Sequence, residues 1–125
     1  MKVSVYTNKA PEAIGPYSQA VVANGMVYTS GQLGMNAEGV LQGETAAEQA
    51  EQSIQNLKAV LEEAGSSIDN VVKTTVFLAD INDFASVNEV YGKHFTKPYP
   101  ARSAVEVANL PKGAKVEIEV VATLS

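Results

Sequence analysis

Cysteine and tryptophan are absent from this sequence of 125 residues, and histidine occurs only once, as His94. Without cysteine the chain has no disulfide, no thiolate nucleophile and no thiolate metal site. One histidine without cysteine cannot build a metal site, and a Ser-His-Asp triad would need a serine and an aspartate placed beside it. We therefore expect no metal. We assign His94 no role beyond solvent contact or a favourable interaction with a helix dipole.

Long apolar runs and clusters of basic residues are missing as well. No stretch of 18 apolar residues occurs, and the N-terminal residues lack the apolar core of a signal peptide. Nine basic residues stand against fourteen acidic ones, which gives a net charge of −5, and this balance disfavours binding to nucleic acid. The expected protein is cytoplasmic and binds neither a membrane nor nucleic acid.

The composition and length favour one globular domain. Hydrophobic residues make up 46% of the chain, an ordinary globular proportion. A chain of this length buries roughly two-thirds of its unfolded surface, which is enough for a core. We therefore expect residues 1–125 to form a single domain.

The first half of the chain indicates three strands and then a helix. Lys2–Tyr6 alternates as an edge strand, and Ser18–Ala23 and Met26–Ser30 flank Asn24-Gly25, the strongest short hairpin signal. Gly31–Glu44 reads as a long loop with four glycines and no nucleotide-binding pattern. Thr45 then opens a helix, because Glu48 three residues later completes a capping box. Its polar face reads as solvated surface, with no sign of chemistry.

The second half indicates an interior strand at Asn70–Ala79, and then a second helix that has cap candidates in Asp80–Asp83 and runs to about Phe95. Asn88 lies on or beside the apolar stripe of that helix. A buried amide must be hydrogen-bonded, so Asn88 is either a structural bridge to a strand backbone or a site residue.

Two further strand-like runs, Ala101–Val107 and Lys115–Thr123, are joined by a Pro-Gly turn, and by themselves they predict a hairpin. Arg102 on one run, and Glu117 with Glu119 on the other, suggest a site for a small carboxylate with an acid or base beside it. A solvated sheet face with a few ion pairs is the alternative. Two helices cover only one face of such a sheet, so we also expect an oligomer.

Five motifs together resemble those of the Rid family (the YjgF type), the reactive-intermediate deaminases. They fall in order over almost the whole chain: Ile14–Gln19, Thr29–Gln32, Asp83-Phe84 with Val87-Asn88, Pro100–Ser103 and Val116–Glu119. The resemblance implies an α+β, two-layer fold like the chorismate mutase of Bacillus. Its six-stranded mixed sheet has the order 1-2-3-6-4-5, with the last strand central and two helices on one face. It also implies a homotrimer with active sites between subunits.

The same resemblance implies hydrolysis of reactive 2-imino or enamine acids, such as 2-iminobutanoate and 2-iminopropanoate, to 2-oxo acids and ammonia without a cofactor. Arg102 would grip the substrate carboxylate bidentately. Glu117 would orient and activate water or pass a proton to nitrogen, and for the proton-donor role burial and Glu119 should raise its pKa. The other implied site residues are Tyr17, Ser30 and Asn88 through their side chains, and Gly31 and Ala104 through their backbones. Well-known bacterial members carry Cys at the position of Ala104, so a thiol has no role here.

Three other functions are compatible with parts of the pattern. The main alternative is a trimeric module that binds a small carboxylate and regulates a partner without turnover, which would need Arg102 but not Glu117. RNA cleavage conflicts with the acidic charge. Chorismate mutase activity would rest on fold analogy alone.

Overall fold

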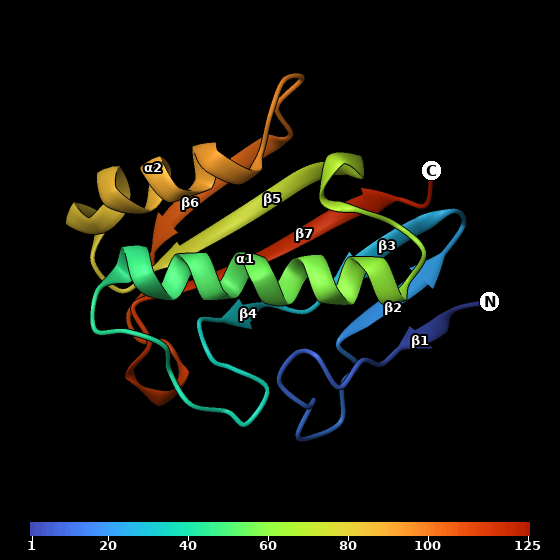
Figure 1. The fold of residues 1–125 in the computed structure, drawn as a ribbon, viewed down its shortest axis with the longest axis horizontal. Helices are drawn as coiled ribbons and strands as arrows, with labels where there is room; N and C mark the ends of the chain where they lie inside the picture. Colours follow the sequence, from blue (N-terminus) through green and yellow to red (C-terminus); the bar gives the residue numbers. More distant parts are fainter.

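One mixed sheet runs through the computed structural model, which describes all of residues 1–125, and two helices pack against it (Figure 1). The strands are β1 (Val3–Val5), β2 (Ala20–Ala23), β3 (Met26–Thr29), β4 (Gln32–Leu33), β5 (Val71–Leu78), β6 (Ala101–Glu106) and β7 (Val116–Thr123). The helices are α1 (Ala46–Glu63) and α2 (Phe84–His94), and three 3₁₀ turns are η1 (Ile68–Asn70), η2 (Ile81–Asp83) and η3 (Pro111–Gly113).

The last strand in the chain, β7, lies at the centre of the sheet, between β3 and β5 and antiparallel to both. The hairpin that the two C-terminal runs predict by themselves is therefore wrong. Instead, β6 pairs with β5 in parallel, with Thr74 opposite Arg102. Alternating burial explains why β7 takes the central place. Its even-numbered residues are buried and its odd-numbered ones are not, and a strand in the centre of the sheet buries its apolar even-numbered side chains best.

The sheet has seven strands, one more than expected. The additional strand, β4, falls inside Gly31–Glu44 and pairs with β7, with Leu33 opposite Glu117. The prediction of an unstructured loop was wrong here, because two residues are too short to show alternation. Apart from β4, the order β1-β2-β3-β7-β5-β6 is the one that the family resemblance implies, and the α+β class is confirmed.

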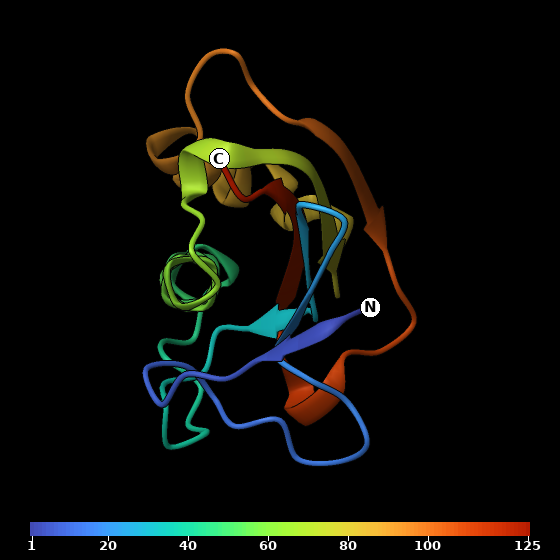
Figure 2. The same ribbon diagram turned by 90° about the vertical axis from the view of Figure 1, so that its right-hand side faces the viewer.

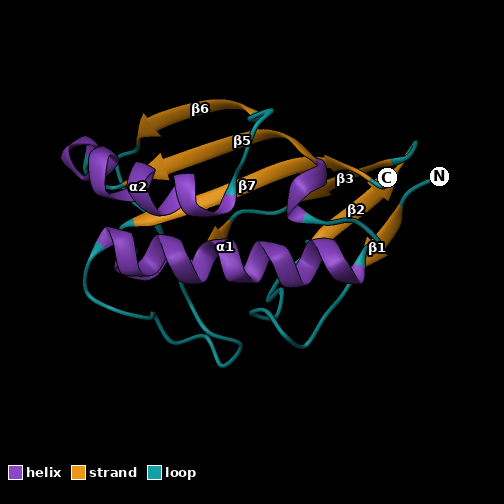
Figure 3. Cartoon of the chain, turned by 45° about the horizontal axis from the view of Figure 1, so that its top comes forward, coloured by secondary structure: helices purple, strands orange, loops and turns teal.

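Both helices cover the same face of the sheet, and no α-helix covers the other face (Figures 2 and 3). The core lies between the helices and the sheet and includes Ile54 and Leu57 of α1, Val87 of α2, and Val116 and Ile118 of β7. No helix is both long and apolar enough to span a membrane. The open face of the sheet presents the unburied half of β5 and β7.

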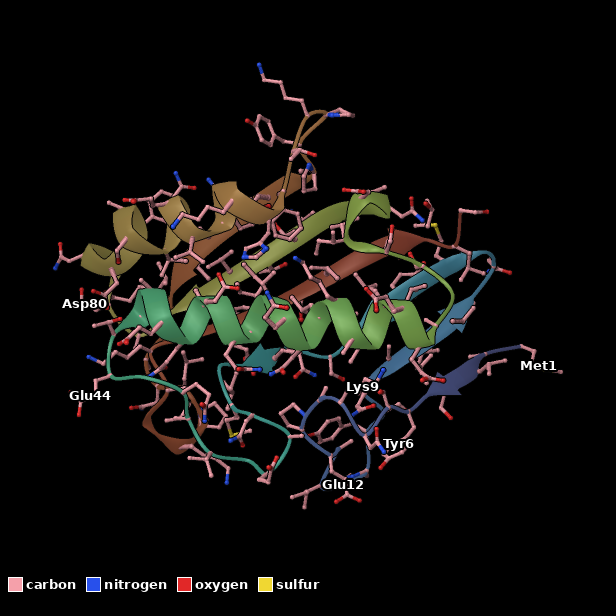
Figure 4. All side chains as sticks on the ribbon, viewed as in Figure 1. Met1, Tyr6, Lys9, Glu12, Glu44 and Asp80 are labelled. Carbon is pink, nitrogen blue, oxygen red and sulfur yellow. The ribbon has the colours of Figure 1, made fainter.

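The local signals for the hairpin and for α1 are confirmed. Asn24 and Gly25 both adopt positive φ, of 51° and 74°, as the two-residue turn requires. Thr45 caps α1, and its side chain and that of Glu48 satisfy each other's backbone N–H groups. Both helices begin at the same end of the molecule, where Glu44 precedes α1 and Asp80 precedes η2 and α2 (Figure 4).

Candidate active site

Arg102 projects from β6 toward the helix-covered face of the sheet. Its register partner Thr74 is fully buried there, 2.9 Å from the hydroxyl of Tyr91 on α2. The guanidinium lies over two rings, 5.1 Å from the centroid of Phe84 and 4.7 Å from that of Tyr91. These cation–π contacts hold the charge flat against α2.

The only side-chain hydrogen bond of Arg102 goes to Asn88. The Nη1 group donates to the Asn88 Oδ1 atom at 2.7 Å, and no carboxylate of the chain is within ion-pair distance, because the one such pair joins His94 and Glu51. Asn88 is exposed in the single chain, so the expectation that its amide is buried was wrong. Arg102 also lines a cavity of about 400 Å³, together with Asn88, Tyr91, Gly92, Tyr99 and Pro100. This cavity suits an anion with a planar pair of oxygens.

Glu117 lies on the opposite, open face of the sheet. Its neighbours Val116 and Ile118 point into the core, and Glu117 is only half-buried. Burial, and then the negative charge of Glu119, raise the pKa of the Glu117 carboxyl above its usual value of 4.5. The direction and both causes agree with the sequence-based expectation for a proton donor.

Gly31 allows the Glu117 carboxyl to lie directly against the backbone. A Cβ added at residue 31 would stand 2.7 Å from the Glu117 Cδ and 2.9 Å from its Oε2, so a side chain at residue 31 would displace the Glu117 carboxyl. Both residues line a second cavity, of about 360 Å³, formed by Pro11, Glu12, Ala13, Ile14, Tyr17, Gln19, Gly31, Gln32, Leu33, Met35, Pro111, Lys112 and Glu117. Its N-terminal wall is the loop that carries Glu12 in Figure 4.

Tyr17 and Ser30 lie on the same side as Glu117. Tyr17 is 55% exposed and lines the cavity of Glu117 as well as a neighbouring one that also includes Ser30. The Ser30 hydroxyl donates to the carbonyl of Ser18 at 2.6 Å, and its backbone N–H donates to the carbonyl of Gln19 at 2.9 Å. These bonds fix the end of β3 beside the loop that presents Tyr17.

A residue without an expected role, Gln19, holds that loop in place. Its Nε2 group donates to the carbonyls of Thr7 and Pro11 at 3.0 and 2.8 Å, and its Oε1 atom accepts from the Thr7 N–H at 2.7 Å. The side chain is only 2% exposed. Because the motif Ile14–Gln19 ends on this glutamine, its place in the motif was the one sequence signal that could have identified it.

The seven expected site residues form two groups within one chain. Tyr17, Ser30, Gly31 and Glu117 gather around the open face, whereas Asn88 and Arg102 lie together on the helix-covered side. Ala104, two residues beyond Arg102 on the same face of β6, packs against the core. A single chain therefore does not bring Arg102 and Glu117 together across one cavity.

His94 lies in the last turn of α2, as a favourable interaction with the helix dipole requires, but the alternative that it lies in solvent was wrong. Its Nε2–H group donates to the Glu51 carboxylate at 2.8 Å, and the Lys58 ammonium donates to its Nδ1 atom at 2.9 Å, so the side chain is only 12% exposed. The hydrogen bond from His94 lowers the pKa of Glu51. These contacts join α1 to α2, and they place part of the polar face of α1 in an interhelical contact instead of solvent.

No group of three or more His, Cys, Asp or Glu side chains is arranged to hold a metal ion. The positioned groups are instead one unpaired guanidinium, one half-buried carboxyl with a raised pKa, and several neutral hydrogen-bonding groups. This set can bind a small carboxylate and transfer a proton.

Comparisons with known proteins agree over nearly the full chain. The family model described as endoribonuclease L-PSP matches residues 7–124. Human 2-iminobutanoate/2-iminopropanoate deaminase is 53% identical over 119 residues, which cover 94% of this chain and 87% of the human protein. The crystal structure of RidA from an Antarctic Psychrobacter species has a TM-score of 0.93 at 49% identity and covers 97% of this chain and 98% of that one. The structure of Escherichia coli TdcF with bound serine has a TM-score of 0.90 at 44% identity, with 98% and 99% covered.

Proposed function

Since the chain belongs to the endoribonuclease L-PSP family, whose members include the reactive-intermediate deaminases, we propose that it hydrolyses 2-imino acids to 2-oxo acids and ammonia. The substrates are small, such as 2-iminobutanoate and 2-iminopropanoate, as the name of the human relative states for that protein. We also propose that residues 1–125 act as one domain. The observation that carries the proposal is the Arg102 guanidinium, which is held in place by Asn88 and two rings but has no carboxylate partner.

Arg102 binds the carboxylate of the imino acid. The fork of the guanidinium matches the two oxygens of a carboxylate, and its orientation is already set by the bond to Asn88, so little rotamer entropy is lost on binding. Asn88 thereby assists binding through its Oδ1 atom and presents its amide N–H groups to the cavity. The backbone of Ala104 lies next along β6 from this anion site.

Glu117 supplies the acid–base chemistry. Water adds to the carbon of the C=N bond while the nitrogen takes up a proton, and the resulting carbinolamine breaks its C–N bond to release ammonia and the 2-oxo acid. The raised pKa keeps more of Glu117 protonated toward neutral pH, which suits it to donate a proton to nitrogen. After donation, the carboxylate can accept the proton that the water loses.

The neutral groups around Glu117 orient water and substrate. The backbone of Gly31 runs against the carboxyl, and the hydroxyls of Tyr17 and Ser30 lie along the adjoining cavity wall. A proton-transfer group of this kind contributes about 10²–10⁴ in rate. That is sufficient for an imine that already hydrolyses in water, and no cofactor is required.

The active site is composite and requires a homotrimer. Arg102 and Glu117 lie on opposite faces of the sheet of one chain. For Arg102 to bind the carboxylate of a substrate while Glu117 protonates its imine nitrogen, the two residues must therefore come from different subunits. The exposed apolar side chains Tyr28 and Val105 on the uncovered sheet face support association of that face. Three subunits in a ring would bring the Arg102 cavity of each against the Glu117 cavity of the next.

A coupled assay tests the proposal directly. A pyridoxal-phosphate dehydratase acting on threonine generates the imine, and the release of 2-oxobutanoate or ammonia is followed with and without the protein. The protein should accelerate the hydrolysis step, and Arg102→Ala should abolish the acceleration while the oligomer stays intact by light scattering. No acceleration by the wild type would rule out the deaminase, and equal acceleration by the wild type and Arg102→Ala would rule out the role of Arg102.

A regulatory module that binds a small carboxylate without turnover is the second candidate. The observation in its favour is the bound serine in the E. coli relative, because serine carries a carboxylate but no imine. Glu117→Gln separates the two functions: it should abolish hydrolysis by a deaminase, but it should leave a binding module intact. The family description also mentions endoribonuclease activity, which the net charge of −5 disfavours.

A further inference from the structure

Three polar side chains of α1 are buried as completely as its apolar ones. Gln49, Ser53 and Asn56 are 3%, 0% and 1% exposed, and their spacing of four and three residues places them along one side of the helix. Burying a polar group costs free energy unless it is hydrogen-bonded. All three are hydrogen-bonded, since no buried side-chain polar atom of the chain lacks a partner.

The partners of this polar row are mainly backbone carbonyls of one segment, residues 32–43. Ser53 Oγ donates to the carbonyl of Gln32 at 2.7 Å, and Asn56 Nδ2 donates to those of Leu33 and Met35 at 3.2 and 2.7 Å. Farther along, Gln49 Nε2 donates to the carbonyl of Gly43 at 3.2 Å. Side chains of α1 therefore hydrogen-bond to both ends of the segment from β4 to the residues that precede α1.

The same segment forms a wall of the Glu117 cavity. Gln32, Leu33 and Met35 line it, and Gly31, directly before them, lies against the Glu117 carboxyl. The β4 strand is only two residues long, and its Leu33 pairs with Glu117 itself. Two ladder residues hold a strand weakly, so its position depends on what packs behind it.

We propose that Ser53 and Asn56 are positioning residues for the Glu117 half of the active site, because their hydrogen bonds hold β4 and Gly31 against the Glu117 carboxyl. The expected effect on the rate of hydrolysis rests on the proposed function, whereas the effect on the position of β4 and Gly31 does not. Apolar side chains would fill the same space, whereas directional bonds to successive carbonyls also fix the register of the segment. Ser53 and Asn56 touch neither substrate nor water in this role.

The position of β4 and Gly31 affects the pKa of Glu117, to which the ionisable groups around the carboxyl also contribute. Glu119 lies beside Glu117 on β7, and the other ionisable side chains that line the same cavity are Glu12, Tyr17 and Lys112. Because burial is the largest cause of the raised pKa of Glu117, withdrawal of the Gly31 backbone admits water and brings the pKa back toward its ordinary value.

The test compares two hydroxyl deletions at opposite ends of the sheet. Ser53→Ala removes a 2.7 Å hydrogen bond to the carbonyl of Gln32, and the control Ser66→Ala removes a 2.6 Å hydrogen bond to the carbonyl of Thr123, far from Glu117. Asn56→Ala is a second variant that removes two hydrogen bonds. Each protein is measured by chemical unfolding, by the hydrolysis assay, and by NMR titration of the Glu117 side-chain carboxyl carbon.

We expect Ser53→Ala and Asn56→Ala to move the Glu117 titration toward lower pH and to lower kcat by about 10-fold, as a small misplacement of a reacting group does. KM should change less, because Arg102 is untouched, and Ser66→Ala should change neither kcat nor the titration. The inference is overturned if Ser53→Ala titrates like Ser66→Ala at Glu117. If the wild type lacks deaminase activity, the titration still decides the positioning role, so the two failures are distinguishable.

Discussion

Gly31 and Glu117 are in such close contact that a Cβ at residue 31 would lie 2.7 Å from the Glu117 Cδ atom. Gly31 does not have positive φ, so the backbone accepts alanine and the only cost of Gly31→Ala is this clash. Because Gly31→Ala would displace the flexible Glu117 side chain, we expect a loss of only about 1 kcal/mol in stability but a loss of hydrolysis, measured by urea unfolding and the coupled assay.

A double variant isolates the contact. In a Glu117→Ala background the clashing Cγ and Cδ atoms are gone, and Gly31→Ala should then be nearly neutral for stability. An equal cost in both backgrounds would show that the glycine serves some other purpose.

The raised pKa of Glu117 predicts how stability depends on pH. Because the folded state favours the protonated carboxyl, the contribution of Glu117 is fully present below its ordinary pKa of 4.5 and is lost as the pH rises through its folded value. Glu117→Gln, which stays neutral, should therefore gain stability relative to the wild type as the pH rises. Urea unfolding across about pH 4 to 8 measures this difference.

Glu48 offers a control of opposite sign. Hydrogen bonds from Thr45 lower the pKa of Glu48, so its contribution is present above the ordinary pKa and is lost as the pH falls. Glu48→Gln should thus diverge from the wild type in the other direction. The same trend in both variants would contradict the assignment for Glu117.

The contact between Arg102 and Asn88 predicts a graded effect on substrate binding. Arg102→Lys keeps the charge but loses the planar fork, and a hydrogen bond to a charged group is worth about 1.5–3 kcal/mol. We expect KM to rise by roughly 10- to 100-fold. Asn88→Ala, which frees the guanidinium to rotate, should raise KM by less. Steady-state kinetics with a constant oligomeric state measure both, and a change in kcat alone would contradict a carboxylate-binding role.

The composite site predicts complementation between two inactive variants. Arg102→Ala and Glu117→Gln subunits, denatured and refolded together in equal amounts, should regain up to about a quarter of the wild-type activity. Random assembly places an intact Arg102 opposite an intact Glu117 at that fraction of the interfaces. Each variant refolded alone should stay inactive. If mixing restores nothing although mixed oligomers form, both residues serve the same chain.

Local sequence signals predicted the elements well, because short-range chemistry determines them. Asn24-Gly25 identified the hairpin, and Thr45 with Glu48 identified the start of α1. Long-range pairing was different: the apolar alternation of β7 fits a hairpin with β6 as well as it fits the centre of the sheet, and only the family resemblance indicated the central place. The deaminase family is confirmed by the comparisons.

The site was foreseen in part. The raised pKa of Glu117 followed from its neighbour Glu119 and expected burial, and both causes are present. The bond from Arg102 to Asn88 and the roles of Gln19 and His94 depend on segments distant in sequence, which no local pattern reports. The homotrimer, the cytoplasmic location and the role of each site residue stay predictions.

The central place of β7 has a consequence for how the protein is made. The hairpin of β2 and β3 on one side, and β5 with β6 on the other, share no strand until Val116–Thr123 inserts between them. We therefore expect the facing edges of β3 and β5 to stay unpaired until Val116–Thr123 has been synthesised, so that the sheet can close only once this segment is available. Unpaired strand edges of this kind are prone to aggregation.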